Sequence, residues 1–199
     1  MNKNKILGFA TFGLFGLAYL ISLIDKLFND MSGFFNMFQN FGAYFELILI
    51  FLLEFLLAIG VLVLSVFGVL KAVKDDHSKL DPFTTFILLG ISGVALLQVI
   101  LSFIWVSRNG GGANLSGREI VHLLFVVFVL VGVLLHMFLK GNKMVGAIAG
   151  IVAAVSLLVL VIMNLANGGN GLNIVFNVFL LLAAVSAAAV YALPLLSKE

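Results

Sequence analysis

The apolar run from Tyr44 to Leu70 restricts the fold of this chain more than any other feature. As a helix, its 27 residues would extend about 40 Å, which exceeds the roughly 30 Å hydrocarbon core of a bilayer. One carboxylate, Glu54, lies close to the middle of the run. A charge at that depth costs several kcal/mol, so such side chains face a bundle interior, a water-filled cavity or a partner group. The run therefore predicts a transmembrane helix with a polar site at Glu54.

Charged residues are scarce along the whole chain. They make up 10% of its 199 residues, whereas hydrophobic residues make up 63%. A soluble domain needs charges at roughly a quarter of its positions to cover its surface. The apolar runs are continuous and do not alternate in polarity, which excludes the short strands of an outer-membrane barrel. We therefore expect an all-α, polytopic integral membrane protein that forms a single membrane domain over residues 1–199.

Six apolar runs predict six transmembrane helices. Ser116 and Glu119 match the S-x-x-E capping box, and Asp81 followed by proline matches a helix N-cap with proline at the first helical position. Gly141 suits a helix C-terminus, and Pro194 follows the last run. The expected spans are residues 6–24, 44–70, 83–106, 120–139, 144–166 and 172–193.

The segment over residues 30–43 has an amphipathic pattern. Its phenylalanines recur at helical spacing, while aspartate, serine, asparagine and glutamine occupy the other side. This pattern suits a helix that lies in the membrane interface, and the alternative is a lid or a pore lining. We expect one amphipathic interfacial helix on the outer side. The expected interfacial anchors, one of them at the end of the third span, are Phe34, Phe38, Phe41 and Trp105.

The lysines and arginines indicate the orientation of the chain. Six spans place both termini on one side, and that side collects eight of the eleven basic residues. The other side has only Lys26, Arg108 and Arg118. By the positive-inside rule, the termini lie in the cytoplasm. The expected location is a prokaryotic cell membrane, with both termini cytoplasmic.

Most polar residues within the spans fall in their middle or outer half. We expect a ligand or ion site that opens outward and is formed by Glu54, Gln98, His122, Glu46 and Asn177. The competing interpretation is a set of ordinary interhelical hydrogen bonds. Glu54 itself has three options: a protonated or Gln98-bonded structural carboxyl, an ion pair with His122 or Arg118, or coordination of a cation or a substrate amine.

Several chemistries are not expected. The chain has no cysteine, which excludes disulfides, thiol catalysis and zinc–thiolate sites. The loop residues Asp75, Asp76, His77 and Asp81 have the residue types of a metal site, but their spacing implies no fixed geometry. The two intramembrane histidines lie at opposite ends of one span and no span contains aspartate, so we expect no enzyme, no metal and no cofactor. The net charge of +2 comes from loop lysines, so nucleic acid is not an expected partner.

Two functions are consistent with this pattern. The first is a non-enzymatic membrane subunit whose partners are the lipid bilayer and either other membrane subunits or further copies of itself. Small residues let helix backbones approach closely, although the same residues can serve packing within the chain. The alternative is a transporter or channel for a small solute or ion, or a ligand-binding transporter subunit, with an outward-facing polar vestibule around Glu54. The small-residue packing faces comprise Gly146, Gly150, Ala154, Ala184 and Ala188.

Overall fold

The computed structural model describes residues 3–74, 80–111, 115–139 and 141–196. Within these ranges every regular element is a helix. Six helices are long, and two short elements lie between the first two long ones. The elements are α1 (Lys3–Asp25), the π-helical segment η1 (Lys26–Asp30), α2 (Met31–Gln39), α3 (Phe41–Val73), α4 (Leu80–Arg108), α5 (Gly117–Phe138), α6 (Lys143–Ala166) and α7 (Gly171–Leu196).

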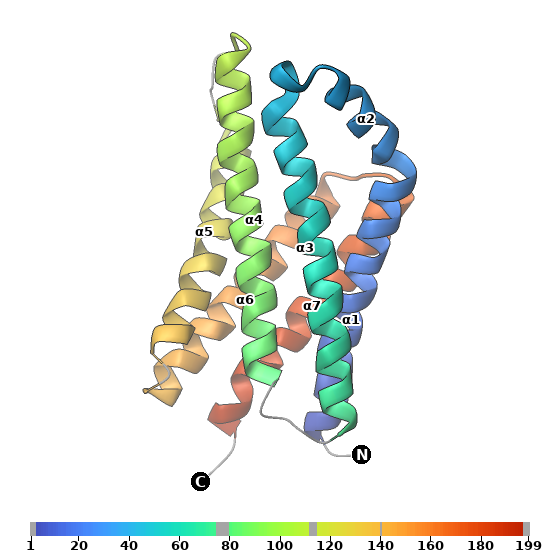
Figure 1. Ribbon diagram of the computed structural model, residues 1–199. Helices are drawn as coiled ribbons and strands as arrows, with labels where there is room; N and C mark the ends of the chain where they lie inside the picture. The colour runs from blue at the N-terminus through green and yellow to red at the C-terminus, as the bar shows by residue number, and fades with distance from the viewer. Residues whose placement is uncertain (1–2, 75–79, 112–114, 140, 197–199) are drawn as a thin grey trace.

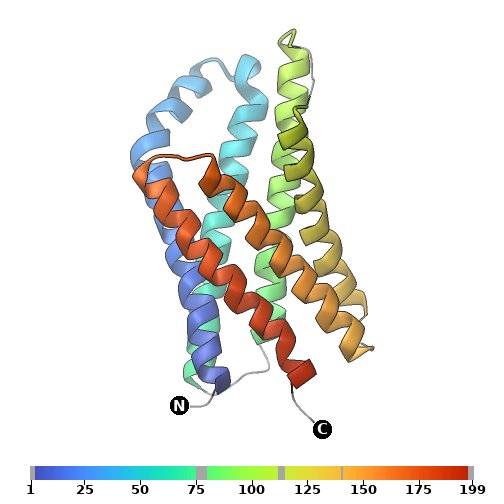
Figure 2. The same cartoon turned by 180° about the vertical axis from the view of Figure 1, so that it is seen from behind.

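The six long helices form one bundle in which each runs antiparallel to the next (Figure 1). Each long helix packs against its neighbour in sequence, and α7 packs against both α6 and α1, so the bundle closes into a ring (Figure 2). We call the end where α1 begins and α7 finishes the terminal end, and the opposite end the distal end. At the distal end, α3 and the α4–α5 hairpin extend beyond the α6–α7 turn (Figures 1 and 2).

The expected fold class is confirmed in part: the described chain is all-helical and has six helices that could span a membrane. Six of the described helices are long and apolar enough to cross a bilayer. The last of them runs further than its sequence indicated, because Pro194 lies inside α7 and not after it. Proline in a last turn removes only one backbone hydrogen bond, so the helix can end two residues later at Leu196. Asp81 likewise lies inside the first turn of α4, which begins at Leu80.

The chain between α1 and α3 forms a π-helical turn and one short helix, whose bounds differ from those of the expected interfacial segment, residues 30–43. Residues 26–30 continue α1 as a π-helical turn, and α2 follows directly. The backbone then bends at Asn40 and again at Tyr44, which both leave helical conformation. The phenylalanines of this region form a ladder of ring contacts, in which Phe34 stacks on Phe51 of α3 with 4.5 Å between ring centroids. Part of the aromatic face of α2 therefore packs against α3.

The antiparallel pairing of α1 with α3 has a regular register. A Cβ atom on Gly8 would lie 2.9 Å from Ala72, one on Gly68 would lie 2.3 Å from the ring of Phe12, and one on Gly16 would lie 3.2 Å from Ser65. The residue numbers in each of these facing pairs add to about 80. Glycine at these points lets the two backbones approach closely, which fixes the register along the whole helix pair.

The small-residue faces of α6 and α7 pack inside the chain. Four of the five expected packing residues are buried, and Ala188 is half-buried. A Cβ atom on Gly150 would lie 2.5 Å from two ring atoms of Tyr191 on α7. The absence of a side chain at Gly150 is therefore what allows the large Tyr191 ring to lie between α6 and α7.

This contact predicts that Gly150→Ala is destabilising. The added methyl group overlaps the Tyr191 ring, and overpacking of this kind costs about 1–3 kcal/mol in free energy of unfolding. Unfolding of the purified protein in mild detergent measures the loss. Gly60→Ala in α3 is the matched control, because a Cβ atom at Gly60 meets nothing within 4 Å. Equal stability of the two variants would contradict the α6–α7 packing described above.

Candidate functional site

A polar cavity of about 450 Å³ occupies the distal half of the bundle. All six long helices and η1 contribute side chains to its lining. The apolar part of the lining comes mainly from leucine and valine side chains of α5, α6 and α7. The polar part contains the following side chains: Tyr19, Ser22, Asp25, Lys26, Asp30, Glu54, Gln98, His122, Asn164 and Asn173.

Glu54 is held by donors from two other helices. The Lys26 ammonium forms an ion pair with Glu54 Oε2, and the Gln98 amide donates to Glu54 Oε1. The Lys26 side chain is 12% exposed and that of Glu54 is 32% exposed. Lys26 also lies 5.5 Å from the centroid of the Phe51 ring, a cation–π distance. Both carboxylate oxygens are therefore hydrogen-bonded, and the negative charge has a positive partner.

The helix register explains why Lys26 reaches Glu54. The residue numbers of this pair also add to about 80, the value of the other facing pairs between α1 and α3. The η1 turn continues α1 past Asp25, so Lys26 stays on the helical path. Because α3 extends further at the distal end than α1 does, the end of α1 lies beside the middle of α3 (Figure 1).

Of the three options for Glu54, the hydrogen bond from Gln98 is present. An ion pair is present as well, but with Lys26 and not with His122 or Arg118. His122 does line the same cavity, but Arg118 lines a neighbouring groove instead. From the sequence, Lys26 was placed in the loop after the first span, because the first apolar run ends at residue 24. The antiparallel register of α1 and α3 is the signal that identifies it.

Carboxylates outnumber cationic groups in the cavity lining. Asp25, Asp30 and Glu54 contribute to it, and Lys26 is the one lysine or arginine among the described lining residues. Asp25 accepts hydrogen bonds from the side-chain amides of Asn29, at 2.5 Å, and Asn170, at 3.3 Å. The Asn170 contact joins the end of α1 to the turn before α7. Asp25 and Asp30 were not among the residues expected from the sequence.

Two of the five expected ligand residues lie outside this cavity lining. Glu46 is 5% exposed and pairs with Arg108 at 2.9 Å, and Arg108 also donates to the carbonyls of Gly42 and Ala43 at the bent start of α3. Asn177 is 2% exposed, and its amide donates to the backbone and side-chain oxygens of Asn173 at 2.8 and 2.9 Å. The structure thus brings together Glu54, Gln98 and His122.

A second hollow of about 500 Å³ lies along α4 and α5. Ala95, Gln98 and His122 line both this groove and the cavity, so the two spaces adjoin at these residues. The start of α5 forms its rim, and the expected capping box is present there. Ser116 N–H donates to Glu119 Oε2 at 2.7 Å, and Glu119 N–H donates to Ser116 Oγ at 3.3 Å.

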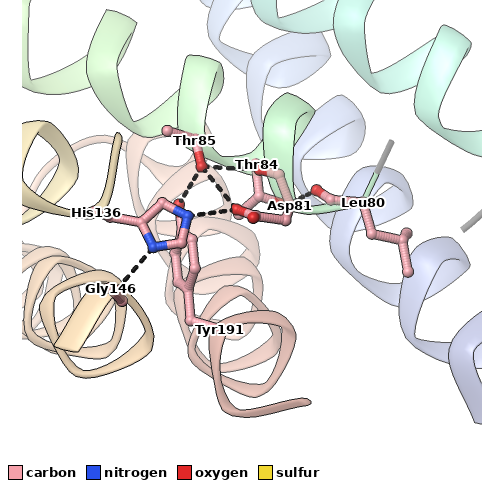
Figure 3. A network of polar contacts seen from close by, with 7 residues as sticks. All are labelled: Leu80, Asp81, Thr84, Thr85, His136, Gly146 and Tyr191. Atoms are coloured by element: carbon pink, nitrogen blue, oxygen red, sulfur yellow. Dashed lines mark hydrogen bonds and ion pairs between the residues drawn. The ribbon is translucent and has the colours of Figure 1, made fainter. Parts of the chain in front are cut away.

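A separate polar cluster lies at the terminal end, where α4, α5, α6 and α7 meet (Figure 3). His136 Nε2 lies 2.6 Å from Asp81 Oδ1, and His136 Nδ1 lies 2.7 Å from the Gly146 carbonyl oxygen. Thr85 Oγ1 lies 3.1 Å from the Tyr191 hydroxyl and also donates to Asp81. Asp81 thus bonds to His136 of α5. The sequence predicted only that Asp81 would cap the start of its own helix.

Metal-ligand geometry does not occur in the described part of the chain. No group of three or more histidine, aspartate or glutamate side chains in the described ranges is placed to hold a metal ion. The remaining members of the loop set, Asp75, Asp76 and His77, lie outside the described residues.

The fold and the cavity define the class of this protein as a helical membrane bundle with an internal polar cavity. Searches against protein-family models, curated proteins and solved structures found no match. Function therefore has to be argued from the residues of the cavity.

The ion pair predicts a specific pattern of stability. Lys26→Met leaves the Glu54 carboxylate without its counter-charge and should lower the free energy of unfolding by about 1–3 kcal/mol, less than for a fully buried pair because Glu54 is partly exposed. The double variant Lys26→Met with Glu54→Gln should regain most of the lost free energy of unfolding, because neither position then carries an unpaired charge. Unfolding of the four proteins in one detergent gives the coupling energy. Simple addition of the two single effects would show that the side chains do not interact.

Proposed function

We propose that this chain is a membrane protein that binds a small cationic solute in the distal cavity and passes it across the bilayer. The observation that carries the proposal is the cavity itself, which is lined from all six long helices and has a paired carboxylate, Glu54, in its wall. Ionisable side chains within membrane helices are costly and rare, and they are characteristic of solute and ion pathways. A volume of about 450 Å³ falls in the range of small-molecule sites.

The charges of the lining favour a cation. Three carboxylates against one lysine leave the described lining with an excess of negative charge. Glu54 already holds an ammonium group, that of Lys26, so a solute ammonium can take the same place on Oε2. The exchange keeps the carboxylate paired throughout, because Lys26 withdraws as the solute binds. The Gln98 amide remains on the other oxygen and orients the carboxylate.

The proposed orientation places the distal end outside the cell. The excess of lysine at the terminal end supports this orientation by the positive-inside rule. The exposed aromatic side chains of η1, α2 and the start of α3 support an interfacial location for that region, since Phe28, Phe35, Phe38 and Phe41 are 81, 61, 51 and 47% exposed. The cavity then opens toward the outer side, and the location in a prokaryotic cell membrane remains part of this proposal.

A role as a subunit of a larger membrane assembly has less support. Its sequence evidence was the small-residue faces of α6 and α7, and those residues pack within the chain. They give no reason to expect a partner chain. Purification in a gentle detergent, followed by identification of copurifying chains, tests the assembly role directly.

Replacement of Glu54 predicts loss of solute binding. Methylammonium, ethanolamine and choline serve as probes of increasing size. We expect at least one to raise the melting temperature of the wild-type protein and to enter proteoliposomes that contain it. Glu54→Gln should abolish both effects and remain folded, because the glutamine amide preserves the size and most hydrogen bonds of the site.

Glu46→Gln is the matched control for this experiment. It removes a buried carboxylate from the same helix, but one that pairs with Arg108 outside the cavity lining. It should therefore retain probe binding and uptake. If Glu54→Gln bound and transported all three probes as the wild type does, the proposed cation site would be refuted.

The orientation predicts opposite labelling of two engineered cysteines. The chain has no cysteine of its own, and a Cβ atom at Gly117 or at Gly141 meets nothing within 4 Å. In intact cells, a membrane-impermeant maleimide should label Gly117→Cys at the start of α5 and should label Gly141→Cys, beyond the end of α5, only after permeabilisation. The reverse pattern would place the cavity end in the cytoplasm.

A further inference from the structure

The polar cluster at the terminal end is not explained by solute binding in the distal cavity. It lines its own cavity of about 520 Å³, which includes Asp81, His136, Lys143 and Tyr191 among its walls. We propose that His136 and Asp81 together form a reversible proton-binding site that holds α4 against α5. This proposal does not depend on the function proposed for the Glu54 cavity, because the two share no residue.

The two hydrogen bonds of the His136 ring indicate which of its nitrogens carry protons. The Gly146 carbonyl can only accept, so the ring nitrogen Nδ1 must carry a proton. The opposite nitrogen, Nε2, lies 2.6 Å from a carboxylate oxygen of Asp81, and this contact also needs a proton between its two atoms. The pair therefore holds one proton more than a neutral histidine beside an ionised aspartate. That extra proton is the proposed ligand.

The two helix ends stabilise the protonated pair in its ionised form. Asp81 lies in the first turn of α4, where the positive end of the helix dipole favours a carboxylate. His136 lies in the last turn of α5, where the negative end favours an imidazolium. Because α4 begins and α5 ends at the terminal end, both dipoles act on the same ion pair (Figures 1 and 3).

Loss of the proton has a structural consequence. Nε2 and the Asp81 oxygen would then face each other as two acceptors at 2.6 Å, an arrangement that is repulsive. The contact between α4 and α5 must then lengthen or admit water from the adjoining cavity. Proton binding thus closes this end of the bundle, and proton release loosens it.

The other groups around the ring define its electrostatic surroundings. Tyr191 of α7 packs edge-on against the ring, with 4.7 Å between centroids, and its hydroxyl bonds to Thr85 of α4. Lys143 of α6 and the amide side chain of Asn4 of α1 line the adjoining cavity. Among the described groups around the ring, the carboxylate is that of Asp81, so Asp81 is the group whose removal we expect to abolish proton binding.

Nitrogen-15 NMR of the histidine ring tests the proposal without any solute. In a His77→Gln, His122→Gln background, His136 is the one histidine left in the chain. Between about pH 5 and about pH 9, the ring signals should change reversibly from two protonated nitrogens to one. Asp81→Asn should hold the ring in the neutral form with the proton on Nδ1 over that whole range, since the asparagine amide donates to Nε2.

Thr85→Val is the matched control. It removes a hydroxyl that bonds to Asp81 and Tyr191 but leaves both members of the pair, so the transition should persist. The proposal is overturned if the ring of the background protein keeps one protonation state throughout, or if Asp81→Asn titrates as the background protein does. The first of these outcomes is decisive even if Asp81→Asn fails to fold.

Discussion

The pairing of Lys26 with Glu54 is the interaction on which the distal half of this bundle depends. A carboxylate in the middle of a long apolar helix needs donors, and the chain supplies them from η1, the continuation of α1, and from α4. Breaking either contact leaves charge or polar atoms exposed in an apolar environment, which is costly. The close glycine contacts between α1 and α3 thus do more than pack helices, because they set the register that brings the two charges together.

In the terminal half, a carboxylate is also paired, but with different residues. There, a carboxylate at the start of α4 meets a histidine at the end of α5, and glycine again provides the approach. Gly146 presents its carbonyl to the ring, and Gly150 leaves room for Tyr191, whose hydroxyl completes the cluster. The small-residue spacing on α6, which resembles a motif for helix association, is accounted for by this internal packing.

Sequence reasoning recovered an all-helical fold with six helices long and apolar enough to cross a membrane, because the length and continuity of the apolar runs determine both features. It also placed Glu54, Gln98 and His122 together, since their depth in the membrane follows from their position along each span. It missed Lys26 because the contact depends on helix register, which hydropathy does not encode. It missed the Asp81–His136 pair for a related reason: Asp81 was interpreted from its neighbour in sequence, Pro82, while its partner lies 55 residues away.

The two polar sites are separated by a layer of buried, mostly apolar side chains, and this separation limits how the proposed transport can work. Along α4, Thr85 and Gln98 are 13 residues apart, about 20 Å, and Ile87 and Leu88 between them are fully buried. Along α5, Val129 and Val133 lie in the same interval and are at most 1% exposed. The hydroxyl of Ser92, in the same interval of α4, donates to the Leu88 carbonyl of its own helix. The buried apolar side chains around it offer a solute few hydrogen-bonding partners. For the proposed transport, passage from one end to the other would therefore require helices that line both sites, α4 and α5 among them, to move relative to their neighbours.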